Sequence, residues 1–151
     1  MTKASLTVVM YHYVRNLKNS RYPKVKGLDC DLFIEQISYL EKHYNFVSIE
    51  QVIQAYTNGL QLPSKAVLLT FDDGYIDHYT NVFPILYNKG IQGAFYAPVK
   101  AITEHKLLDV NKIHFIRAAS VIENILAATK RLLIKYQEEY QLLPFKGYWD
   151  K

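Results

Sequence analysis

Short apolar runs alternate with stretches of helical periodicity over the first hundred residues. The run LTVVMYHYV at residues 6–14 consists mainly of β-branched and aromatic residues, which predicts a buried strand. Residues 66–71 and 94–97 are also predicted to form strands, and residues 46–47 form a very short candidate strand. Pro98 follows the last of these runs, where a proline would end strand pairing.

Helical periodicity fills the gaps between the predicted strands. In the first stretch the apolar residues lie on one helical face, which consists of Leu32, Phe33, Ile37, Leu40 and Tyr44. Ser48 and Gln51 have the spacing of a capping box, so a second helix is predicted to begin there and to end near Gly59. A third helix is predicted over residues 75–89, with a kink or restart at Pro84.

The pattern changes after Pro98. Residues 99–111 look like an irregular connection, and residues 111–141 are almost wholly helix-forming. We therefore predict two parts, an α/β part over residues 1–98 and a helical insertion or extension over residues 99–151. Strands that alternate with helices predict a parallel sheet, and three or four strands are too few to close a barrel. The expected fold is an incomplete α/β barrel with a helical C-terminal segment.

Charge, cysteine content and hydropathy exclude several classes of protein. The 151 residues have a net charge of +4, with Lys and Arg scattered along the chain, so we expect no nucleic-acid partner. The single cysteine excludes an internal disulfide and a cysteine-based metal cluster. We find no secretory leader pattern and no apolar run of membrane-spanning length, so we expect a cytoplasmic protein without a membrane span.

Two adjacent carboxylates, Asp72 and Asp73, stand at the end of a predicted strand in the stretch LLTFDDGY. Neighbouring negative charges repel each other unless water or a cation screens them. Loops at the carboxyl ends of parallel strands build active sites in α/β folds, so one acid could bind a metal ion while the other transfers a proton. Gly74 suits a sharp turn at this point. The alternative is structural, because Asp before Gly is also common in turns and helix caps.

Five segments between Val8 and Val99 carry a resemblance to one family. They are VVMYHYV, FVSIEQVI, LLTFDDGYID, FPILYNKGI and GAFYAPV, in this order. The chain resembles the N-terminal part of the polysaccharide deacetylases, also called the NodB-homology or carbohydrate esterase family four group. The resemblance implies an incomplete (β/α) barrel of the polysaccharide deacetylase type. It also implies the removal of N-acetyl groups from an amino-sugar polysaccharide or glycan.

The resemblance also implies roles for individual residues and a cofactor. By position, Asp72 would be the general base, and Asp73 the first ligand of a divalent metal ion. Zn²⁺ is the expected ion, with Co²⁺ or Ni²⁺ as alternatives. His12 would line the substrate pocket, and Tyr75 would lie at its edge. The metal ion would activate water and offset the repulsion between the two carboxylates.

The family completes its metal site with a downstream His-Ser/Thr-x-x-His pattern, which these 151 residues lack. The histidines are His12, His43, His78, His105 and His114, and none have that spacing. Two hypotheses follow. In the first, the chain is part of a metal-dependent deacetylase and is inactive by itself, with weak metal binding. In the second, it is a non-catalytic remnant that binds a glycan or another protein. Under both, the open barrel edge favours self-association.

Overall fold

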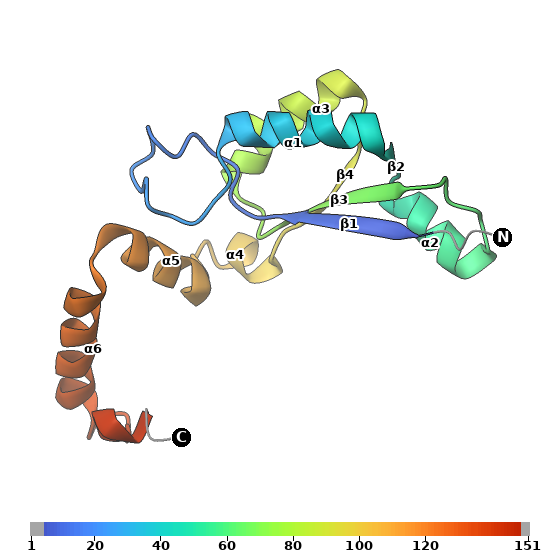
Figure 1. The fold of residues 1–151 in the computed structure, drawn as a ribbon. Coiled ribbons are helices and arrows are strands. Elements are labelled where there is room, and N and C mark those ends of the chain that lie inside the picture. The colour runs from blue at the N-terminus through green and yellow to red at the C-terminus, as the bar shows by residue number, and fades with distance from the viewer. Residues whose placement is uncertain (1–4, 149–151) are drawn as a thin grey trace.

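The computed structural model describes residues 5–148 of the chain. Its centre is a parallel sheet made of β1 (Leu6–Tyr11), β2 (Asn45–Phe46), β3 (Ala66–Asp72) and β4 (Gly93–Tyr96). Strand β3 is central, because all three other strands pair with it (Figure 1). β1 lies along β3, and β2 and β4 pair with successive parts of it. This open parallel sheet confirms the predicted incomplete α/β barrel.

Helices cover the sheet and continue beyond it. They are α1 (Cys30–His43), α2 (Ile49–Asn58), a π turn (His78–Val82) that runs into α3 (Phe83–Lys89), α4 (Val99–Thr103), α5 (Asp109–Ala119), α6 (Ile122–Tyr136) and a 3-10 turn (Phe145–Tyr148). In Figure 1, α1 and α3 lie over one face of the sheet, whereas α5 and α6 extend away from it. Within residues 5–148, no helix combines the length and the apolar composition that crossing a membrane requires.

Local signals set both ends of α2. The Ser48 side chain accepts a hydrogen bond from the Gln51 N–H, and the Gln51 side chain accepts one from the Ser48 N–H. This reciprocal pair is the predicted capping box. Gly59 ends the helix in the left-handed conformation, with a φ of 69°, as its position after the last helical residue predicts.

The predicted irregularity at Pro84 takes the form of the π turn. Pro84 has no N–H, so it cannot continue the regular bond to the carbonyl of Thr80. Just before it, the Phe83 N–H bonds to the carbonyl of His78, five residues earlier. The helical segment therefore has a widened first half and a regular second half, and it ends at Gly90 as predicted.

The main core lies between one face of the sheet and helices α1 and α3. Its buried residues are Tyr11, Val14, Phe33, Ile37, Leu40, Val67, Leu69, Phe71, Val82 and Leu86. The Phe71 ring stacks on the Tyr11 ring with centroids 5.2 Å apart, which joins β3 to β1. On the opposite face of β3, Ala66 and Leu68 are buried beneath α2. Both faces of β3 are therefore covered.

β1 is covered on one face only, so the prediction of a buried first strand is partly wrong. Val8 and Met10 are 53% and 60% exposed, whereas Tyr11 faces the core. The strand also ends at Tyr11 rather than at Val14. The chain turns away from the sheet there, and Val14 forms an isolated bridge with Leu28 instead.

The segment after Pro98 also differs from its prediction. Residues 99–111 are not an irregular connection, since α4 occupies Val99–Thr103 and α5 begins at Asp109. The predicted long helix is divided into α5 and α6 near Ser120, whose backbone is extended (φ −138°, ψ 153°). α6 has no buried residue, so its apolar stripe does not contribute to a core in the described part of the chain.

Candidate functional site

The candidate site lies at the edge of the sheet where the parallel strands end. Asp72 is the last residue of β3, and its backbone lies beside that of Tyr96 in β4. Tyr11 at the end of β1 lies beside Phe71, so His12 leaves the sheet next to Asp72. Asp72 and His12 are both half-buried. Ligands of α/β proteins bind outside the carboxyl ends of the strands, and these two predicted residues share that edge.

Asp73 begins a tight turn. Its φ is 73° and that of Gly74 is 59°, both in the left-handed region. A Cβ on Gly74 would lie 2.8 Å from the Cβ of Ala97, which follows β4, so a larger residue would not fit without movement. Non-glycine residues in this region are uncommon and cluster at functional sites. The sharp turn predicted at Gly74 is confirmed, and Asp73 shares its unusual backbone.

A short chain of hydrogen bonds holds the Asp73 carboxylate. The Tyr75 hydroxyl donates to Asp73 Oδ2 over 2.5 Å, and Asn111 Nδ2 of α5 donates to the Tyr75 oxygen over 2.7 Å. Burial raises the pKa of Tyr75, and the bond to Asp73 raises it further, so the hydroxyl keeps its proton and remains a donor. Asn111 is only 4% exposed, so a buried contact fixes α5 to this side of the site.

Stacked rings extend this wall toward the segment after β1. The Tyr13 ring stacks on the Tyr75 ring, with centroids 4.0 Å apart. The Arg15 guanidinium lies 4.7 Å from the Tyr13 centroid, within the range of a cation–π contact. The Tyr13 hydroxyl lies 3.4 Å from Nδ1 of His114 in α5. Three segments that are far apart in the sequence therefore form one wall beside Asp73.

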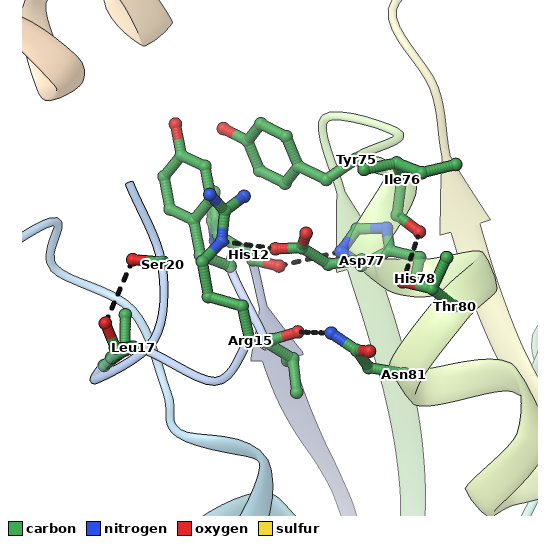
Figure 2. A network of polar contacts seen from close by, with 12 residues as sticks. His12, Arg15, Leu17, Ser20, Tyr75, Ile76, Asp77, His78, Thr80 and Asn81 are labelled. Carbon is green, nitrogen blue, oxygen red and sulfur yellow. Dashed lines mark hydrogen bonds and ion pairs between the residues drawn. The ribbon is translucent and has the colours of Figure 1, made fainter. Parts of the chain in front are cut away.

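Three polar contacts join the segment after β1 to the helical turn after Asp72 (Figure 2). The donor–acceptor pairs are Arg15 Nε to Asp77 Oδ2 (2.6 Å), His78 Nε2 to the His12 carbonyl (2.7 Å) and Asn81 Nδ2 to the Val14 carbonyl (2.9 Å). Asp77 and His78 are buried, so these contacts are shielded from water. The helical turn therefore fixes the backbone that carries His12.

The structure brings the four predicted site residues to one edge of the sheet. Asp73 and Tyr75 are in direct contact, Asp72 ends β3, and His12 directly follows the neighbouring strand β1. The sequence reasoning missed the supporting residues, which are Tyr13, Arg15, Asp77, His78 and Asn111. All but Asn111 lie within or next to the segments that carry the family resemblance. Their position beside those segments is the one feature of the sequence that could have identified them.

The described residues do not fit a complete metal site. Within residues 5–148, no group of three or more His, Cys, Asp or Glu side chains is placed so that it could hold a metal ion. Asp72 and Asp73 supply two carboxylates, whereas a catalytic zinc site has three protein ligands. The residues present therefore match only part of the metal site that the family resemblance implies.

Comparisons with known proteins point to one family. The model of the polysaccharide deacetylase family matches residues 59–131, which include β3 and both carboxylates. A stretch of 53 residues is 57% identical to the poly-β-1,6-N-acetyl-D-glucosamine N-deacetylase of Escherichia coli K12, and covers 34% of this chain and 8% of that protein.

Two solved structures are similar over a larger share of the chain. A de-N-acetylase from Aggregatibacter actinomycetemcomitans has a TM-score of 0.56 and 32% identity, over 67% of this chain and 40% of that one. The deacetylase PplD of Streptococcus pyogenes has a TM-score of 0.52 and 25% identity, over 72% of this chain and 50% of that one.

This chain spans half or less of the length of each of these relatives. The family match, the sequence identity and the similar fold nevertheless agree, and they confirm the resemblance carried by the TFDDGY stretch and its flanking segments. The comparisons therefore support a polysaccharide deacetylase domain, and residues 59–131 are the part that matches the family model.

Proposed function

We propose that this chain supplies part of an active site that removes N-acetyl groups from an amino-sugar polysaccharide or glycan. The observation that carries the proposal is the pair Asp72 and Asp73 at the carboxyl edge of a parallel sheet, with Asp73 oriented by Tyr75. A relative named for poly-β-1,6-N-acetyl-D-glucosamine supports this class of substrate.

In this proposal Asp72 is the general base. Hydrolysis of an acetamide forms a bond from a water oxygen to the acetyl carbon and breaks the bond from that carbon to nitrogen. Asp72 accepts the proton that the water loses, and the proton then goes to the leaving amine, so the products are acetate and a free amino sugar. Its half-buried position at the open sheet edge suits a group that must meet both water and substrate.

Asp73 is the proposed metal ligand, and His12 and Tyr75 are the proposed pocket residues. The Tyr75 hydroxyl binds Asp73 Oδ2 and leaves Oδ1 without a hydrogen-bond partner among residues 5–148. Outer-shell hydrogen bonds of this kind orient metal-binding carboxylates. Since two carboxylates fall short of three protein ligands, we expect the 151-residue chain alone to bind Zn²⁺, Co²⁺ or Ni²⁺ weakly and to release no acetate.

Acetate release from N-acetylglucosamine oligomers tests the proposal. A longer protein that includes this chain and supplies the further metal ligands should release acetate. Asp72→Asn should lower its kcat by at least about 100-fold, because a general base contributes that much or more. Glu138→Gln removes an exposed carboxylate that follows α6 and should leave kcat unchanged. An Asp72→Asn variant with full activity would overturn the assignment of the base.

The chain alone provides a second test. Calorimetry with Zn²⁺ should show weak binding, and acetate release should stay at the level of a sample without protein. Tight one-to-one binding together with acetate release would contradict this expectation. It would show that histidines, such as His12 with His105 or His114, complete the metal site in a conformation different from the one described.

Glycan binding without catalysis is a second candidate function, and one surface feature favours it. Three exposed rings, Tyr79, Phe83 and Tyr87, follow one another along the helical segment, with successive centroids 6.3 Å and 5.6 Å apart. Exposed aromatic faces offer a flat apolar surface on which a sugar ring can stack. Oligomer binding that Tyr87→Ala abolishes and Asp72→Asn preserves would favour this function.

A further inference from the structure

A small cavity with a basic lining lies between the loop after β1 and helix α5. Its volume is about 170 Å³, and it is lined by Lys24, Lys26, His114, Arg117 and Ala118. Two of these residues come from the loop and three from α5. Nothing in the proposed deacetylation uses this cavity.

Buried apolar residues lie next to the basic residues of the cavity and hold their backbone in place. Val25 and Ala118 are 4% and 8% exposed and belong to one hydrophobic cluster with Tyr13. Lys24 and Lys26 flank Val25, and Arg117 directly precedes Ala118. Burial of the two apolar residues therefore holds the attachment points of three cationic side chains around the same cavity.

Backbone contacts fix the loop further. The Val25 N–H bonds to the Tyr22 carbonyl over 3.1 Å, and the Leu28 N–H bonds to the Tyr13 carbonyl over 2.9 Å. Gly27 lies so close to Tyr13 that a Cβ on it would be 2.8 Å from the Tyr13 Cβ. The loop that carries Lys24 and Lys26 is therefore packed closely against Tyr13.

Among the described residues, no carboxylate forms an ion pair with the lysine and arginine side chains around the cavity. The ion pairs within residues 5–148 are Arg15–Asp77, Lys89–Glu41, Lys106–Glu104 and Lys112–Asp109. Lys24, Lys26 and Arg117 take part in none of them. Like charges that line one concave site repel each other and attract an anion, because the low-dielectric wall strengthens the local field.

We propose that this cavity binds a phosphate group. A guanidinium presents a planar fork of N–H donors that matches phosphate oxygens, and lysine ammonium groups bind phosphate as point charges. A phosphate monoester carries a charge of roughly −1.5 to −2 at pH 7, so it matches three cations better than a single carboxylate does. When the Tyr13 hydroxyl donates to His114 Nδ1, the neutral imidazole carries its proton on Nε2 and gains a further N–H donor.

The cavity is connected to the candidate active site through ring contacts. His114 contacts Tyr13, Tyr13 stacks on Tyr75, and the Tyr75 hydroxyl bonds to Asp73. A phosphate bound here would lie along the same wall as the two carboxylates. We therefore infer that the phosphate belongs to a phosphorylated amino sugar, and this part of the inference rests on the proposed function.

Calorimetry at low ionic strength, where charge screening is weak, tests the inference with three probes. They are inorganic phosphate, N-acetylglucosamine 6-phosphate and unmodified N-acetylglucosamine. Inorganic phosphate should bind one-to-one, and Arg117→Gln and Lys24→Gln should each weaken it by about tenfold or more, as expected for a charged hydrogen bond. Arg131→Gln is the matched control, because it removes the same charge from an exposed position on α6.

The outcomes separate the two parts of the inference. Equal effects of Arg117→Gln and Arg131→Gln, or phosphate binding no stronger than chloride binding, would overturn the phosphate site. Tighter binding of the sugar phosphate than of inorganic phosphate, with no binding of the unmodified sugar, would support a phosphorylated amino sugar. Equal binding of the two phosphates would overturn that assignment and support a site for free phosphate.

Two controls test whether the loss of phosphate binding could come from unfolding or from the deacetylase site. The urea midpoint of Arg117→Gln should equal that of the unmodified chain, since the Arg117 side chain is exposed. Asp72→Asn should leave phosphate binding unchanged, so a failure of the deacetylase proposal would not be mistaken for a failure of the phosphate site. Loss of phosphate binding in Asp72→Asn would contradict a cavity separate from the carboxylates.

Discussion

Replacing Gly74 by alanine should destabilise the protein more than the same replacement at Gly59 or Gly90. The three glycines have φ values of 59°, 69° and 64°, so an alanine at each adopts a disfavoured left-handed backbone. That conformation costs about 1–2 kcal/mol for a residue with a Cβ. The new Cβ at Gly59 or Gly90 would meet no heavy atom within 4 Å, so this cost is the whole expected effect.

Gly74 differs because the turn that it forms is pressed against the end of β4. Its new Cβ would lie 2.8 Å from the Cβ and 3.1 Å from the Cα of Ala97. Overpacking of this kind costs about 1–3 kcal/mol. The expected loss in the free energy of unfolding is therefore about 2–5 kcal/mol for Gly74→Ala and about 1–2 kcal/mol for the other two variants.

Urea denaturation followed by circular dichroism measures the three losses, with an unchanged slope showing that the unfolding transition is the same. Adding Ala97→Gly to Gly74→Ala removes the nearest atom and should restore part of the lost stability. Equal midpoints for Gly74→Ala, Gly59→Ala and Gly90→Ala would refute the close approach to Ala97. Failure of the double variant to recover any stability would count against it as well.

Three further predictions concern the wall, the core and the exposed strand. A double-mutant cycle of Tyr75→Phe and Asn111→Ala in urea denaturation should show a coupling of about 0.5–1.5 kcal/mol, because both changes break one hydrogen bond, and a coupling near zero would contradict that bond. Burial raises the pKa of Tyr11 to about 12 from a usual value of 10.0, so its stabilising contribution is complete below pH 10 and is lost between pH 10 and 12. The urea midpoint of Tyr11→Phe should therefore fall less over that pH window than that of the unmodified chain. Val8 and Met10 are exposed on a strand that, within the described residues, pairs with β3 alone. Light scattering at tens of micromolar should therefore show dimers or larger species, and a clean monomer would refute an associating sheet face.

The sequence predicted the elements whose signals are local. The capping box at Ser48 and the left-handed Gly59 act within one helical turn, so adjacent letters are enough to identify them. Exposure on β1 was mispredicted because Val8 and Met10 are as apolar as the residues of a buried strand. Whether a strand face is covered depends on helices elsewhere in the chain, and no helix within residues 5–148 covers Val8 and Met10.

In the candidate site, too, adjacent residues could be predicted from the sequence, whereas contacts between distant residues could not. The two carboxylates could be predicted because Asp72 and Asp73 are adjacent and follow a strand-like run. The contacts that support them join distant residues, such as Asn111 with Tyr75, 36 positions apart. No periodicity or spacing rule reports a contact that depends on where α5 packs. The basic cavity escaped the sequence reasoning for the same reason, since Lys24 and Lys26 look like part of a scattered basic surface until α5 brings Arg117 beside them.

The pairing of β1 with β3 affects how the chain is made as well as how it is held together. Leu6 pairs with Ala66, so about 60 further residues must be synthesised before β1 has its partner strand. At roughly 5–20 residues per second, this takes about 3–12 s. Helix α1 can form from its own local contacts during that interval, whereas the apolar strand LTVVMY stays unpaired and available to other chains. Among the four described strands, β1 therefore waits longest for its partner, and it is the one that most needs protection from other chains during synthesis.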